Sequence, residues 1–94
     1  MNKVGISFEE VKADLLKDKE FEAEYERLRP RYEAIEQIVK ARKEQNITQE
    51  ELAKRIGTQK SNISRLESGN YNPSLDLLIK IADALGKRLN VQLQ

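Results

Sequence analysis

The sequence predicts a small all-α bundle that ends in one short β-strand. Apolar residues recur at steps of three and four over most of the chain, and helix-capping signals divide this pattern into segments. Alternation with a period of two is confined to the last residues. A chain of 94 residues has the length of one domain with a modest core.

Composition argues against several classes of protein. The chain has no cysteine, which excludes a disulfide framework and a thiolate metal site, and no histidine, which removes the commonest general base. Neither a nucleophile elbow nor a phosphate-binding loop is present. The sequence therefore predicts no enzyme, no metal and no cofactor. Because it also lacks a membrane-length apolar run and a secretion leader, we expect a soluble, cytoplasmic protein with no membrane partner.

Charge is divided unevenly although the net charge is only +1. Residues 1–39 hold seven Lys and Arg against ten Asp and Glu, whereas residues 40–94 hold ten against six. Such an acidic front and basic back predict two surfaces with different partners. Chance patchiness in a highly charged chain is the alternative.

Two helical patterns occupy the N-terminal half. A capping box at Ser7–Glu10 starts the first helix, which is expected to end near Asp18. The second pattern runs to about Gln45 and contains Pro30, which predicts either a kinked helix or two abutting helices. Its apolar stripe keeps steps of four and three through Phe21, Tyr25, Leu28, Tyr32, Ile35 and Val39.

Three shorter helices follow. Thr48 and Glu51 form a second capping box, and Gly57 is placed to end that helix. Thr58 is the expected N-cap of the next one. The last helix opens at residues 72–74 and closes at Gly86. The side chains expected to face the core from this last helix are Leu75, Leu78, Ala82 and Leu85.

The helix after Thr58 has an unusual polar face. On a helical wheel with Lys60 at zero, Ser64, Ser68, Ser61 and Arg65 fall at roughly 40°, 80°, 100° and 140°. Ile63 and Leu66 fall on the opposite side, at roughly 300° and 240°. Short hydroxyl side chains flanked by two cations suit the major groove of double-stranded DNA. Two capped helices joined by a tight turn also form a helix-turn-helix arrangement.

The segment "ITQEELAKRIGTQKSNISRLESGNYNPSLDLLIKIADALG" resembles the helix-turn-helix domain of Cro/cI-type (XRE) repressors. The resemblance covers roughly residues 35–86 and implies a lambda-repressor-like bundle with extra N-terminal helices. It implies that Gln49 holds a phosphate and that Arg42 and Glu67 brace the bundle. It assigns base contacts to Gln59, Lys60, Ser61 and Arg65, with Asn62 and Ser64 at the margin. It assigns contacts with the DNA backbone to Thr58, Asn70, Tyr71 and Asn72.

The C-terminal residues alternate in polarity, which predicts a strand. A single strand leaves its backbone groups unpaired, so the expected partner is the same strand of a second copy. This predicts a homodimer whose dimerisation residues are Leu89, Val91 and Leu93. A frayed tail is the alternative.

The acidic N-terminal region and the final strand together resemble the HigA-type antitoxins. This resemblance implies an antitoxin that neutralises a small, basic, RelE-like toxin and represses its own operon. A stand-alone phage- or plasmid-type repressor is the alternative function. The expected organisation is a toxin-binding segment at 1–31, a DNA-binding domain at 32–86 and a dimerisation strand at 87–94. The expected partner-binding side chains are Phe8, Val11, Leu15, Phe21, Tyr25 and Leu28.

Overall fold

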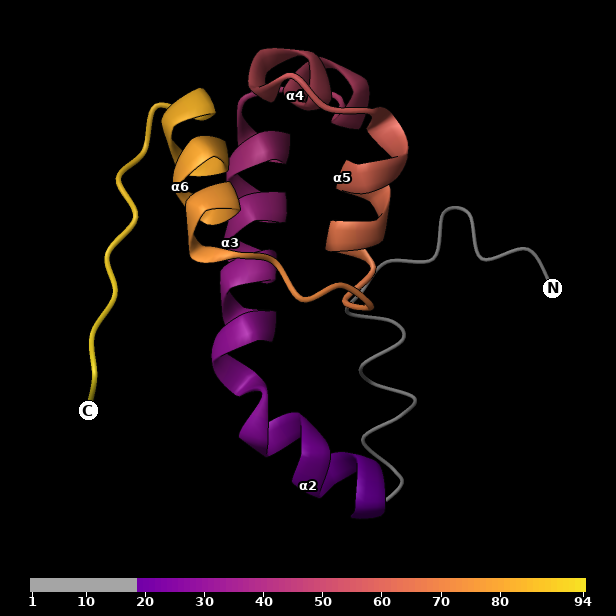
Figure 1. Ribbon diagram of the computed structural model, residues 1–94, viewed down its shortest axis with the longest axis vertical. Helices are drawn as coiled ribbons and strands as arrows, with labels where there is room; N and C mark the ends of the chain where they lie inside the picture. Colours follow the sequence, from indigo (N-terminus) through magenta and orange to yellow (C-terminus); the bar gives the residue numbers. More distant parts are fainter. Residues whose placement is uncertain (1–18) are drawn as a thin grey trace, which may run out of the picture.

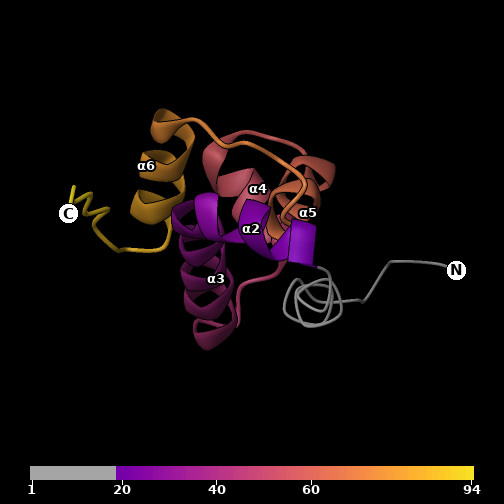
Figure 2. The same cartoon turned by 90° about the horizontal axis from the view of Figure 1, so that it is seen from below.

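The computed structural model describes residues 19–94, which form five α-helices (Figure 1). The long helix α3 (Arg29–Glu44) stands between α5 and α6 in Figure 1, and α4 packs against both α5 and α6 (Figures 1 and 2). The helix expected at Ser7–Asp18 lies outside the described residues. The helices are α2 (Lys19–Arg27), α3 (Arg29–Glu44), α4 (Gln49–Ile56), α5 (Lys60–Glu67) and α6 (Leu75–Ala84).

The apolar stripe of residues 21–39 belongs to two abutting helices, which decides between the two interpretations of Pro30. Leu28 alone separates α2 from α3, and Pro30 falls in the first turn of α3. A first-turn proline removes no helical hydrogen bond, so it is well tolerated there. The Tyr25 and Tyr32 rings stack across the junction with centroids 4.9 Å apart. This contact keeps the stripe in register.

The predicted start and end of α4 are confirmed. Its first turn is capped by Thr48, whose hydroxyl accepts a 3.0 Å hydrogen bond from the Glu51 amide. Gly57 ends the helix with φ +74°, a left-handed conformation that favours glycine. The Glu51 carboxylate accepts from Arg55 instead of completing the capping box.

Thr58 is not the N-cap of α5, so that prediction is wrong by one residue. The Thr58 amide donates to the Ala53 carbonyl at 2.9 Å and thus completes the turn that closes α4. Gln59 is the N-cap, without a side-chain capping bond. The Thr58 hydroxyl accepts from the Asn62 side-chain amide at 2.7 Å.

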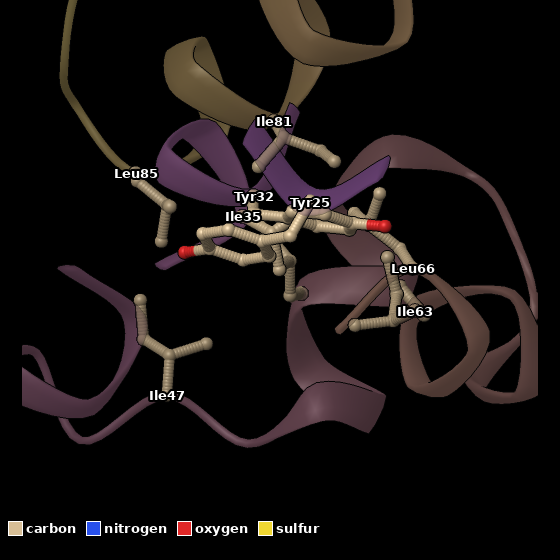
Figure 3. Packing of buried hydrophobic residues seen from close by; sticks show 10 residues of the cluster. Tyr25, Tyr32, Ile35, Ile47, Ile63, Leu66, Ile81 and Leu85 are labelled. Carbon is tan, nitrogen blue, oxygen red and sulfur yellow. The ribbon is translucent and has the colours of Figure 1, made fainter. Parts of the chain in front are cut away.

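The core lies where α3, α4, α5 and α6 meet (Figure 3). Its five fully buried side chains are Ile35, Leu52, Ile63, Leu66 and Ile81. α6 contributes Ile81 rather than the predicted Leu75, which is 55% exposed. Because α6 is apolar around most of its circumference, periodicity could not decide which side turns inward. Leu85 is buried as predicted, and Leu78 and Ala82 are half-buried.

The C-terminal segment, residues 87–94, forms neither helix nor strand in the single chain, so the predicted strand is not confirmed. It runs beside α6 (Figure 1). A strand is defined by pairing with a neighbour, and none of residues 19–86 pairs with it. Leu89 is half-buried, whereas Val91 and Leu93 are 64% and 98% exposed.

Candidate nucleic-acid interface

The interface is built by α4 and α5, which pack directly on each other. Ile63 and Leu66 anchor α5 in the core, so the opposite side of this helix faces outward. In both Figure 1 and Figure 2, α5 lies at the far side of the molecule from α6 and the C-terminal segment. The predicted base-contacting side chains on this outward side are all exposed, and they are Gln59, Lys60, Ser61, Asn62 and Arg65.

Two cations flank the outward side of α5. Among residues 19–94, neither Lys60 nor Arg65 makes an ion pair or a side-chain hydrogen bond. Both charges are therefore available to phosphate oxygens or guanine edges. At the end of the helix, the Ser68 hydroxyl donates to the Arg65 carbonyl at 2.7 Å.

The remaining predicted backbone contacts lie beyond the two ends of α5. Asn70 and Asn72 are exposed, whereas Thr58 and Tyr71 are half-buried. Thr58 accepts a hydrogen bond from Asn62, so its own hydroxyl proton stays available for an acceptor such as a phosphate oxygen. Tyr71 also packs against the core cluster, which gives its ring a structural role.

A buried ion pair ties α5 to α3, as the family resemblance implied. Arg42 donates through Nε to Glu67 Oε2 at 2.7 Å and through Nη2 to Glu67 Oε1 at 2.8 Å. Its Nη1 donates to the Ile47 carbonyl at 2.9 Å. The pair is almost entirely buried, with side-chain exposures of 11% and 7%. Such a bidentate pair fixes the orientation of α5 relative to α3.

Gln49 is placed differently from the exposed phosphate ligand that we expected. It is half-buried, and its Nε2 donates to Glu67 Oε1 at 2.9 Å while its Oε1 accepts from the Ser64 hydroxyl at 2.6 Å. One Nε2 hydrogen remains for a phosphate. The bond to Ser64 was not predicted, and this serine was expected only at the margin of the interface, although its wheel angle lies between those of Lys60 and Ser61.

The predicted partner-binding residues lie at the other end of α3. Tyr25 is a core residue rather than a surface contact, because the residue is 8% exposed and its ring stacks on Tyr32. Phe21 and Leu28 are half-buried and pack against the same core. Phe8, Val11 and Leu15 lie outside the described residues. The predicted domain boundary after residue 31 falls inside α3, so α2 and the DNA-binding helices share one core.

Residues 19–94 contain neither a metal-binding group nor a membrane-spanning helix. No group of acidic side chains there is arranged to hold a metal ion. None of the helices in this range is long and apolar enough to cross a membrane.

Comparisons with known proteins agree with this geometry. A helix-turn-helix family model matches residues 38–92, more than half of the chain. An uncharacterised HTH-type transcriptional regulator of Methanothermobacter thermautotrophicus is 54% identical over 49% of this chain and 67% of its own length. A second one, from Archaeoglobus fulgidus, is 52% identical over 47% of this chain and 62% of its own. The chain thus spans only about two thirds of these relatives.

A solved structure of a toxin–antitoxin module from Streptococcus pneumoniae contains a chain with the same fold. That chain is 29% identical to this one and superimposes with a TM-score of 0.57. The superposition covers 99% of this chain and 98% of that one. The family match includes the two interface helices, the residues that connect them and the buried Arg42–Glu67 pair. The chain therefore belongs to the helix-turn-helix family of DNA-binding transcription regulators.

Proposed function

We propose that this protein is a sequence-specific DNA-binding antitoxin that represses its own operon and neutralises a small basic toxin. The observation that carries the DNA-binding part is the outward side of α5, where Lys60 and Arg65, which form no ion pair within residues 19–94, flank short hydroxyl side chains. A helix with this surface enters the major groove, where Arg and Lys contact guanine and short side chains allow close approach.

The contacts divide into those that specify sequence and those that position the protein. Lys60, Arg65, Ser61 and Gln59 contact base edges, with Asn62 beside them. Thr58 donates to a phosphate with the proton that its bond from Asn62 leaves available. The second Nε2 hydrogen of Gln49 also reaches a phosphate, at the positive end of α4. Asn70, Asn72 and the Tyr71 hydroxyl contact the backbone beyond the other end of α5.

Replacing the two cations tests DNA recognition. Lys60→Ala and Arg65→Ala should each reduce discrimination between the promoter and a scrambled sequence by about 1–3 kcal/mol. Titrations of both DNA fragments measure this difference. Lys80→Ala removes an exposed cation from α6 and serves as the matched control. If Arg65→Ala weakens binding to both fragments equally, Arg65 is a phosphate contact and not a base contact.

The toxin-binding part rests on the acidic surface of α2 and on the likeness to a chain of a toxin–antitoxin module. Glu20, Glu22, Glu24 and Glu26 are all exposed there, on a helix at the opposite end of α3 from α4 (Figure 1). Glu24 and Glu26 form exposed pairs with Arg27 and Arg29, which a cationic partner can displace because such pairs contribute little. A basic ribonuclease-like toxin is electrostatically complementary to this surface.

Charge reversal on α2 tests toxin binding while leaving the core intact. Glu22→Lys with Glu26→Lys should abolish growth rescue from the product of the adjacent gene and weaken its binding at least tenfold. Promoter binding should persist. The control, Glu44→Lys with Asp83→Lys, makes the same charge change at exposed positions of α3 and α6. Equal rescue by both double variants would contradict toxin binding by α2.

A stand-alone repressor is the second candidate, favoured by the names of the relatives, which mention transcription regulation alone. In that case α2 serves only the shared core. The neighbouring reading frame separates the two: a small basic gene beside this one supports the antitoxin, and its product should co-purify with the full chain. A toxin-free neighbourhood supports the repressor.

In both cases we propose a homodimer joined through Leu89, Val91 and Leu93. A two-fold dimer of this kind presents its two α5 helices to half-sites about 10 bp apart, or a multiple of that spacing.

A further inference from the structure

The Ser64 hydroxyl ends a chain of hydrogen bonds that begins in the core. Arg42 donates to both carboxylate oxygens of Glu67, and Glu67 Oε1 also accepts from Gln49 Nε2 at 2.9 Å. Gln49 Oε1 in turn accepts from Ser64 at 2.6 Å. The four side chains come from three helices: Arg42 from α3, Gln49 from α4, and Glu67 and Ser64 from α5.

The direction of every bond in this chain is fixed by chemistry. A guanidinium has only donors, so Glu67 must accept from it through both oxygens. The Gln49 amide therefore turns its NH₂ group toward Glu67, because the flipped amide would set two acceptor oxygens 2.9 Å apart. Its oxygen then faces Ser64. The single hydroxyl proton of Ser64 is consumed by this bond, and only its lone pairs remain for a ligand.

Ser64 lies in the middle of the DNA-facing side of α5. Its wheel position, roughly 40° from Lys60, lies between those of Lys60 and Ser61. Ser64 is half-buried rather than buried, so part of its surface is open to a ligand, and its Oγ keeps acceptor capacity while it donates to Gln49. A phosphate cannot be that ligand, since its oxygens are acceptors. In the major groove, adenine N6 and cytosine N4 are donors, whereas guanine O6 and thymine O4 are acceptors.

We propose that Ser64 is a specificity-determining residue that selects an amino base, adenine or cytosine, on the contacted strand and rejects the keto bases guanine and thymine. Gln49 is its positioning residue, because it accepts the hydrogen bond from the Ser64 hydroxyl and so prevents that hydroxyl from donating to a base. The inference rests on the proposed DNA-binding function. Ser61 differs, since its hydroxyl bonds to no other side chain in residues 19–94 and can rotate to donate or accept.

Selection from a DNA library with randomised half-sites tests the inference. The wild-type chain should enrich sites in which one position prefers adenine and cytosine over guanine and thymine by roughly 2- to 10-fold, the effect of a single hydrogen bond. Ser64→Ala should lose this preference at that position and keep the others. The Gln49→Met variant should bind sites with keto bases at that position as well as sites with amino bases. Without the Gln49 acceptor, the Ser64 hydroxyl can donate to a keto oxygen or accept from an amino group.

Ser74→Ala is the matched control, because it removes a serine hydroxyl that caps α6 and lies outside the network. It should leave the amino-to-keto ratio unchanged, and thermal unfolding of each variant confirms that all remain folded. The inference is overturned if wild type enriches a defined sequence and Ser64→Ala enriches the same one with the same ratio. If wild type enriches no sequence at all, the proposed DNA-binding function fails, and the inference fails with it.

Discussion

The α4–α5 part and the α6 part of the molecule differ in how far their apolar and polar side chains find partners within residues 19–94. On the α4–α5 side, the apolar residues of α5 are fully buried, and its Glu67 bonds to Arg42 of α3 and to Gln49 of α4. On the α6 side, apolar residues remain exposed on both the helix and the C-terminal segment: Leu75, Ile79, Val91 and Leu93. The proposed DNA-binding surface is thus built on a fully packed core, whereas the α6 part exposes apolar side chains of the kind that the proposed dimer would cover.

The polar contacts of the two sides differ in the same way. The α6 side is held by bonds to carbonyl groups at the end of the helix, from Gln45 to Leu85 at 2.7 Å and from Arg55 to Ala84 at 3.0 Å. These donors satisfy carbonyls that a helix end leaves unpaired. They fix where α6 ends without covering its exposed side. A groove lined by α3, α6 and the C-terminal segment remains open.

Removing one partner of the buried Arg42–Glu67 pair is expected to cause the largest loss of stability. Arg42→Ala should lower the free energy of unfolding by about 3–5 kcal/mol, because it leaves the Glu67 carboxylate buried without its cation. Urea denaturation measures the loss. Arg27→Ala is the control: its partner Glu24 is exposed, and we expect a change of at most about 1 kcal/mol. Equal losses for the two variants would contradict the distinction between buried and exposed pairs.

Replacing the whole pair sharpens this test. Arg42→Met with Glu67→Leu removes both charges together, so stability should return close to that of the wild type. The double variant still leaves Gln49 without its carboxylate acceptor. We therefore expect a folded protein whose DNA recognition is altered. Restored stability with an unchanged base preference would show that the ion pair has no part in ordering the DNA-binding surface.

The next effect concerns the α6 side. Val91→Asp with Leu93→Asp should weaken the dimer by about 2 kcal/mol or more, since both are apolar anchors in the proposed contact. Sedimentation measures the association. Both side chains are exposed in the single chain, so its unfolding should change little. Gln92→Asp with Gln94→Asp is the matched control, because it adds the same charge on the alternate side of the segment. If the control dissociates equally, charge rather than apolar contact explains the result.

The smallest effect concerns the helix caps on either side of the α4–α5 turn. Thr48→Ala should lower stability by about 1 kcal/mol, because the Thr48 hydroxyl is the acceptor for the first turn of α4. Thr58→Ala should lower it less, since this hydroxyl bonds to the Asn62 side chain and caps no helix. Thermal unfolding of the two variants measures the difference. A larger loss for Thr58→Ala would restore the capping role that the sequence suggested.

The two threonines also show where a sequence can be read reliably. Thr48 precedes an isolated helix start, so its capping signal has only one interpretation. Thr58 follows Gly57 directly, and its amide is already used to close α4. A cap and a helix end thus compete for one residue, and only the backbone path decides. The orientation of α6 was unpredictable for a similar reason, because several of its sides are apolar enough to face the core.

By itself, the sequence determined the helices, most of their ends, the outward cationic side of α5 and the Arg42–Glu67 pair that the family resemblance implied. These features depend on residues three or four positions apart, or on a dense family motif, and both can be recognised in the sequence alone. Three features became visible only in the folded chain: Tyr25 is a core residue, Ile81 rather than Leu75 turns inward, and the Ser64 hydroxyl already donates to Gln49. The bond from Ser64 to Gln49 spans 15 residues and the bond from Gln49 to Glu67 spans 18. Their directions follow from which helices meet, and local sequence does not encode that meeting.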